Sequence, residues 1–185
     1  MIRIVGGLYK GRKINVAIGK NVKATSEKVR EAIFNILSSV LTWKEFSALD
    51  LYSGSGALGL EALSRGAKKT FFVELTNKNI ETIKKNIELI SPEQDRVELF
   101  QNRALNWITH FFNFELKGVV FLDPPFSSNE YGPTLEKLST HSALKKGSFI
   151  VVQSHQSKKI LIPKNLEIFK QRKYGSIMLH ILKKN

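Results

Sequence analysis

The 185-residue chain contains no cysteine. This absence excludes disulfide bonds, thiolate metal sites, iron–sulfur clusters and any mechanism that uses a thiol nucleophile. No apolar run approaches the roughly 18 residues that a membrane-spanning helix requires, and the first residues, MIRIV, do not resemble a signal peptide. The four histidines lack metal-ligand spacing. We therefore expect a soluble, cytoplasmic protein with no metal and no membrane partner.

Acidic residues are scarce, with 16 Asp and Glu against 29 Lys and Arg, for a net charge of +13. The excess lies at the two ends. Residues 1–30 and residues 156–185 each carry eight basic side chains and one glutamate, whereas residues 31–155 are nearly neutral. This distribution favours a catalytic body with two flanks that bind a polyanion. The alternative is a charged surface that serves only solubility.

Between the ends, short apolar segments alternate with amphipathic ones. This alternation predicts an α/β fold, in which a mostly parallel, Rossmann-like sheet is covered by helices on both faces in three layers. The strands are expected at 47–52, 70–75, 96–101, 119–122 and 148–153. The helices are expected at 26–41, 57–65, 77–90, 104–112 and 134–144.

The two ends of the chain depart from this pattern. Glycines punctuate residues 3–14, which predicts a small basic β hairpin. At the other end, residues 166–173 and 176–182 flank Tyr174-Gly175 and predict an antiparallel hairpin on the sheet edge. We therefore expect a basic N-terminal extension over residues 1–24 and one α/β domain over residues 25–185.

A glycine-rich loop joins the first expected strand to its helix. Gly54, Gly56 and Gly59 have the spacing of a dinucleotide-binding turn, so NAD is one ligand to consider. Asp50 ends the strand, where its carboxylate would repel a pyrophosphate but suits the ammonium and sulfonium groups of S-adenosylmethionine. Glu74 ends the next strand and could accept the ribose hydroxyls of either cofactor. The loop favours adenosylmethionine over NAD or a turn without a ligand.

A second loop follows the buried strand 119–122 and reads Asp123-Pro124-Pro125-Phe126. Ligands of open α/β sheets bind beyond the carboxyl ends of the strands, so the two loops should face each other. The prolines stiffen the second loop and leave carbonyl oxygens as acceptors. Asp123 and the Pro124 carbonyl would hold the two hydrogens of an exocyclic amine while Phe126 stacks on its ring. This arrangement predicts methylation of an aromatic amine.

Residues 49–67, 71–75 and 122–126 resemble the amino-methylating class I methyltransferases, and residues 3–14 and 24–37 narrow the resemblance to the RsmD-type family. The resemblance implies a seven-stranded sheet, adenosylmethionine as donor and Asp123 to Phe126 as the catalytic centre. It further implies the N2 amine of one guanine in small-subunit (16S) ribosomal RNA as the target, within an assembling 30S particle. We expect a monomer, with a cofactor bound by Asp50, Tyr52, Gly54, Ser55, Gly56, Glu74, Leu75, Asn102, Arg103 and Ala104.

Three positions depart from the pattern of the family. Asn102-Arg103-Ala104 stands where an acid commonly meets the adenine amine, so Asn102 or a backbone carbonyl must serve there. Thr76 replaces an acid that often follows Glu74 by two residues. Gln153 replaces a glutamate at the end of the fifth strand, and its neutral amide can still hydrogen-bond a guanine edge.

The basic N-terminal residues are the expected phosphate contacts, and they predict RNA binding that weakens strongly with salt. These residues are Arg3, Lys10, Arg12, Lys13, Lys23 and Arg30. Two other targets fit the same scaffold, adenine N6 and a protein glutamine. A non-catalytic ribosome-assembly factor that binds RNA through its basic ends is a further alternative.

Overall fold

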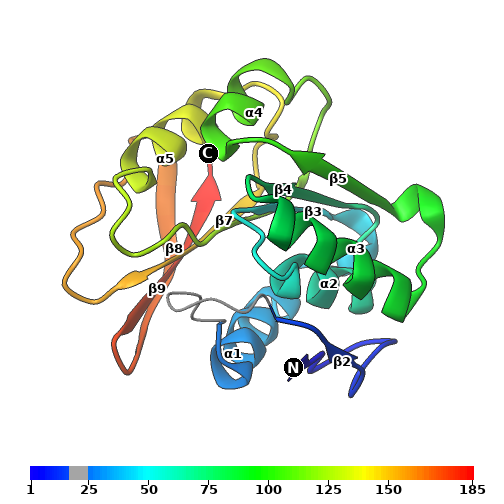
Figure 1. Ribbon diagram of the computed structural model, residues 1–185. Coiled ribbons are helices and arrows are strands. Elements are labelled where there is room, and N and C mark those ends of the chain that lie inside the picture. The colour runs from blue at the N-terminus through cyan, green and yellow to red at the C-terminus, as the bar shows by residue number, and fades with distance from the viewer. Residues whose placement is uncertain (17–24) are drawn as a thin grey trace.

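The computed structural model describes residues 1–16 and 25–185. Its centre is a seven-stranded sheet in the order β5-β4-β3-β6-β7-β9-β8 (Figure 1). The strands are β3 (Ser47–Leu51), β4 (Thr70–Glu74), β5 (Val97–Gln101), β6 (Gly118–Leu122), β7 (Phe149–His155), β8 (Leu166–Tyr174) and β9 (Ile177–Lys184).

Strands β3 to β7 run parallel to one another, and helices connect them. Because side chains alternate between the faces of a strand, each face of the sheet builds its own core. Buried residues of α4 (Ala104–His110) and α5 (Tyr131–Thr140) pack on one face. Those of α1 (Glu27–Ser38), α2 (Ala57–Ser64) and α3 (Asn77–Ile90) pack on the other. The three-layer α/β architecture expected from the sequence is confirmed.

The last two strands form the expected antiparallel hairpin. β9 lies antiparallel between β7 and β8, so β8 forms one edge of the sheet. Gly175 turns the hairpin with a φ of +58°, a conformation that glycine adopts without steric cost. The register pairs His155, the last residue of β7, with Ile177, the first of β9. The hairpin turn is therefore level with the carboxyl end of β7.

Two helices differ from their expected bounds by three residues or more at one or both ends. The Ser26 side chain accepts a hydrogen bond from the Val29 amide and caps α1, but the helix ends at Ser38, before Leu41. Its last turn tightens there, because the Val40 amide donates to the Leu37 carbonyl three residues earlier. Helix α5 begins at Tyr131 instead of residue 134 and includes Pro133. Proline is tolerated in the first turn of a helix, where its missing N–H needs no partner.

A small two-stranded sheet, β1 (Ile2–Arg3) and β2 (Lys13–Ile14), precedes α1. In this N-terminal segment, the side chains of Ile4, Tyr9 and Ile14 are buried in one cluster with residues of α2, α3 and β4. The division of the chain at residue 24 stays a prediction. Within the described ranges, no helix is both long enough and apolar enough to span a membrane.

Candidate active site

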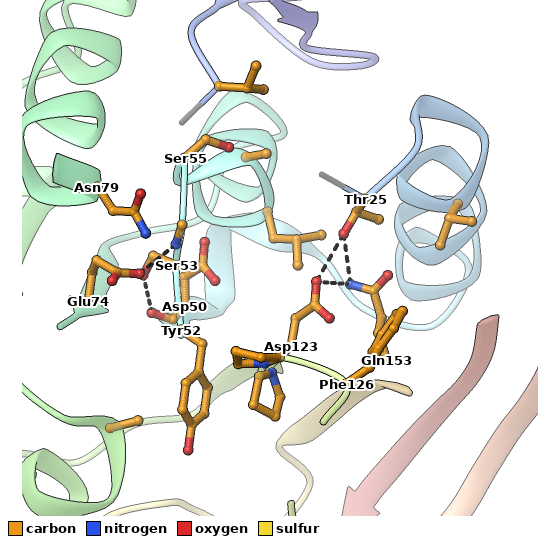
Figure 2. Close-up of a pocket in the computed structure, with 18 of the residues that line it drawn as sticks. Thr25, Asp50, Tyr52, Ser53, Ser55, Glu74, Asn79, Asp123, Phe126 and Gln153 are labelled. Carbon is orange, nitrogen blue, oxygen red and sulfur yellow. Dashed lines mark hydrogen bonds between the residues drawn. The ribbon is translucent and has the colours of Figure 1, made fainter. Parts of the chain in front are cut away.

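A cavity of about 760 Å³ lies at the carboxyl ends of the parallel strands. Figure 2 shows Asp50 and Glu74 on one side of it, and Thr25, Asp123, Phe126 and Gln153 on the other. The glycine loop and the loop after β6 therefore face each other across one open space, as the sequence predicts. The predicted cofactor and catalytic residues that line it are Asp50, Tyr52, Gly54, Ser55, Glu74, Leu75, Asn102, Arg103, Ala104, Asp123, Pro124, Pro125 and Phe126.

The glycines of the first loop have different roles. Gly54 lines the cavity with a φ of +56°, and the nearest atom to an added Cβ, the Tyr52 carbonyl oxygen, lies 3.9 Å away. Gly56 is absent from the cavity lining and caps α2 with a φ of +76°; its added Cβ would lie 3.2 Å from Phe72. At Gly59 that distance falls to 2.3 Å. Gly56 and Gly59 thus serve the turn and the packing of α2 on β4, while Gly54 is open to a ligand.

Asp50 is buried at the tip of β3, and its Oδ2 accepts a hydrogen bond of 2.8 Å from the Gly59 amide. Gly59 is in the first turn of α2, where a dinucleotide would place its pyrophosphate. A carboxylate already occupies that end of the helix, so an anionic group there would be repelled. Burial raises the pKa of Asp50 well above its ordinary value, the Gly59 hydrogen bond opposes this, and the carboxyls of Asp123 and Glu74 add to it. A cationic ligand would relieve this cost.

Glu74 is buried at the end of β4 and holds the two loops that follow β3 and β4. Its Oε1 accepts hydrogen bonds from the Leu75 and Thr76 amides, each 2.9 Å, and from the Thr76 hydroxyl. Its Oε2 accepts only the Gly54 amide among the described residues, at 2.9 Å. A carboxylate oxygen has about two acceptor positions. Oε2 is therefore the oxygen with capacity for one ribose hydroxyl.

Asp123 is partly buried on the opposite wall, and two side chains hold its Oδ2. The Thr25 hydroxyl donates at 3.1 Å and the Gln153 amide nitrogen at 3.2 Å, and Gln153 also donates to Thr25 at 3.2 Å. Among the described residues, no donor reaches Oδ1. Burial raises the pKa of Asp123 to about 7, and the hydrogen bond from Thr25 opposes the rise.

The rest of the Asp123 loop is held from the side of α5. The Tyr131 hydroxyl lies 3.0 Å from both the Pro124 and the Gln153 carbonyl oxygens, which share its single proton. The Pro124 carbonyl keeps its second acceptor position for a ligand. Lys158 donates to carbonyls of the loop, including that of Phe126. These hydrogen bonds restrict the loop in addition to the two prolines.

Sequence reasoning missed Thr25 and Tyr131 as parts of the site, and Asn79 of α3 also lines the cavity. Thr25 directly precedes the helix cap Ser26, so the sequence offers only a capping signal at this point. Tyr131 follows Pro124 by seven residues, and the sequence of the loop does not predict that the Tyr131 side chain packs back against it.

The basic N-terminal candidates separate into two groups. Arg30 is 1% exposed, and its guanidinium donates to the carbonyls of Thr25, at 2.7 Å, and Arg3, at 2.6 Å. The expected contact of Arg30 with an RNA phosphate conflicts with this burial, because the guanidinium is hydrogen-bonded to backbone carbonyls of the chain before α1. Arg12 is exposed and donates to the Leu89 carbonyl at the end of α3. Arg3, Lys10 and Lys13 are exposed, and Lys23 lies outside the described residues.

Across the residues that the structure describes, no group of three or more His, Asp or Glu side chains is placed to hold a metal ion. The ligand-binding capacity of the cavity therefore rests on its carboxylates, backbone groups and apolar walls.

Comparison with known proteins identifies the family. A family model described as "Conserved hypothetical protein 95" matches residues 2–183. The chain belongs to this family. A relative named ribosomal RNA small subunit methyltransferase D from Haemophilus influenzae is 33% identical over 176 residues, which covers 95% of this chain and 90% of the relative. The protein of the same name from Escherichia coli K12 is 30% identical, covering 95% and 86%. The resemblance to the RsmD-type family is confirmed.

Solved structures agree with the family assignment. A putative methyltransferase from Escherichia coli superposes with a TM-score of 0.86 at 27% identity and covers 100% of this chain and 98% of that chain. A putative methylase from Haemophilus influenzae gives a TM-score of 0.83 at 31% identity, covering 99% and 98%. The fold of this family member is therefore the class I methyltransferase fold over its described length.

Proposed function

We propose that this protein transfers a methyl group from S-adenosylmethionine to the exocyclic N2 amine of a guanine in 16S ribosomal RNA. One observation carries the proposal: Asp50 and Glu74 face Asp123 and Phe126 across a single cavity. Relatives named for methylation of small-subunit ribosomal RNA support the substrate class.

The donor-binding wall suits this cofactor. Asp50 and Glu74 offer carboxylates to an ammonium group and a ribose, and Gly54 leaves backbone space between them. Leu75, Asn102 and Ala104 line the end of the cavity where the adenine would lie. Bound adenosylmethionine supplies a methyl group on a positively charged sulfur, and the acidic lining of the cavity is complementary to that charge.

The opposite wall suits a planar amine. Asp123 Oδ1 and the Pro124 carbonyl are positioned to accept the two N–H groups of the amine, which directs the nitrogen lone pair toward the donor. A new C–N bond would form as the bond between the methyl carbon and the donor sulfur breaks and leaves its electron pair on sulfur. Asp123 would stabilise the positive charge that develops on the nitrogen and receive the released proton or pass it to water. Holding the nitrogen in line with the methyl carbon contributes up to about 7–11 kcal/mol.

Thr25 and Gln153 give Asp123 its orientation. Both donate to Oδ2, which leaves Oδ1 as the acceptor for the substrate amine. Donors to a carboxylate stabilise its charged form, so these contacts also keep Asp123 ready to accept. The ring of Phe126, which is partly exposed beside the loop, offers a stacking surface for the target base.

Labelled methyl transfer tests this proposal. Small ribosomal subunits and naked 16S RNA from cells that lack the protein are incubated with it and labelled adenosylmethionine, and mass mapping locates the product. We expect one N2-methylguanine per RNA and preference for assembled subunits. Label in N6-methyladenine or in protein glutamine would indicate one of these alternative substrates instead. Absence of adenosylmethionine binding by calorimetry would favour a non-catalytic assembly factor.

A further inference from the structure

The C-terminal hairpin of β8 and β9 lies at one edge of the sheet (Figure 1), and β8 carries the basic residues Lys170, Arg172 and Lys173. Its turn, residues 174–177, lines the cavity beside Asp123 and Gln153. β8 is the edge strand of the sheet and is largely exposed along its length. A surface that begins at the target-binding wall and runs outward is where the chain on either side of a bound nucleotide must lie.

Strand register places two basic residues and one aromatic residue of β8 in a row. Lys170, Arg172 and Tyr174 pair with Ile181, Leu179 and Ile177 of β9. These three β9 residues belong to the core cluster that contains α1, and directly paired residues share a face. The row therefore projects on the α1 side of the sheet and ends at the cavity. Its repeat of about 6.6 Å, two strand residues, is close to the separation of adjacent phosphates in an extended single strand.

The basic side chains of this row are available to bind phosphates. Among the described residues, no basic side chain after residue 155 makes an ion pair with an acid. The single acid of β8, Glu167, lies at the end of the strand far from the turn. Lys28, exposed in the first turn of α1, also lines the cavity. The positive charge thus continues from β8 to the cavity mouth.

Three of the N-terminal arginines are already engaged by partners within the protein. Arg30 is buried, and Arg3 lies 3.7 Å from Glu27 in an ion pair. Arg12 is bound to carbonyls at the last residues of α3, whereas the cavity touches this 14-residue helix at Asn79, in its first turn. A helix of that length spans about 20 Å. Arg12 is therefore held at the end of α3 that points away from the cavity.

We propose that Lys170 and Arg172 bind phosphates of single-stranded RNA adjacent to the target nucleotide, and that Tyr174 stacks on the neighbouring base. The inference rests on the proposed function, because it takes the Asp123 wall as the site of the target base. RNA sites of this kind combine a basic track with an aromatic platform. Phosphate contacts next to the target offset the free energy needed to unstack it.

Salt-dependent binding tests the row. The double variant Lys170→Gln and Arg172→Gln is compared with the double variant Lys68→Gln and Lys146→Gln. This control removes two exposed charges that precede β4 and β7, at the amino ends of the parallel strands and opposite the cavity. Affinity for a short single-stranded RNA is measured by fluorescence anisotropy over a range of salt. The hairpin variant should bind about tenfold more weakly, with a slope of log K against log salt smaller by about 1.4. The control should lose much less affinity.

Steady-state kinetics and a third variant distinguish a loss of RNA binding from a loss of catalysis or of donor binding. In the hairpin variant the KM for small subunits should rise while kcat and the calorimetric affinity for adenosylmethionine stay as in wild type. Tyr174→Leu, which keeps an apolar side chain against the core, should weaken RNA binding without changing the salt slope. Equal slopes in the hairpin variant and the control would overturn the inference. If the wild-type protein methylates no ribosomal RNA, the proposed function fails instead.

Discussion

On the glycine-loop wall of the cavity, Asp50 and Glu74 accept hydrogen bonds from backbone amides of the loops and helix that follow β3 and β4. On the opposite wall, Asp123 is held by the side chains of Thr25 and Gln153, which are 98 and 30 residues away in sequence. Backbone donors are present whatever the residue type. A wall held by side chains is therefore more easily disrupted by single substitutions.

The largest effect should come from removing the acceptor on the side-chain-held wall. Asp123→Ala should lower kcat for methyl transfer by about 1,000-fold, since the developing charge on nitrogen loses its stabilising group. The affinity for adenosylmethionine, measured by calorimetry, should change only slightly, because the other wall binds it. Near-normal turnover in this variant would show that the Asp123 wall does not supply the catalytic acceptor.

The matching change on the other wall should affect donor binding. Asp50→Asn keeps an acceptor for the Gly59 amide but removes the negative charge. We expect the affinity for adenosylmethionine to fall about 10- to 100-fold, the usual range for a charged hydrogen bond, with a smaller change in kcat at saturating donor. A large loss of kcat with unchanged donor affinity would contradict the comparison.

A smaller effect should follow when Asp123 is kept but one of its two donors is removed. In wild type, kcat/KM should rise with pH through about 7, because only the ionised carboxyl accepts both the amine and its proton. Thr25→Val removes a donor that favours the ionised form, so kcat at neutral pH should fall about tenfold or less and the midpoint should move to higher pH.

Thr25→Ser is the matched control and should restore both the rate and the midpoint. Asp50 and Tyr131 also interact electrostatically with Asp123, and neither residue is changed in these variants. An unshifted pH profile in Thr25→Val would mean that Thr25 serves only to support the fold.

The smallest effect concerns stability without ligand. The pKa of Asp123 is about 7 in the folded protein and about 4 when unfolded, so the folded state binds more protons between these values. Folding stability from this group is complete below pH 4 and is lost as pH rises to 7. Asp123→Asn should therefore raise Tm by a few degrees at pH 8, and the difference should shrink toward pH 4. Calorimetric scans at several pH values test this, and a lower Tm at pH 8 would oppose it.

Much of the fold was predictable from periodicity. The five parallel strands and the final hairpin appear within a few residues of their expected positions, because a buried strand bounded by turns leaves a short apolar run. Helix ends were less predictable. α1 stops at Ser38 and α5 includes Pro133 in its first turn, since both ends depend on local hydrogen bonds that apolar spacing does not record.

The sequence by itself determined that the glycine loop and the Asp123 loop meet, because parallel strands bring their carboxyl ends to one edge of a sheet. Tertiary structure alone decided that Arg30 is buried, that Thr25 reaches Asp123, and that the turn of the C-terminal hairpin lines the cavity. These outcomes depend on contacts between segments far apart in the chain. Charge and composition are properties of a segment, whereas exposure and partners are set by what packs against it.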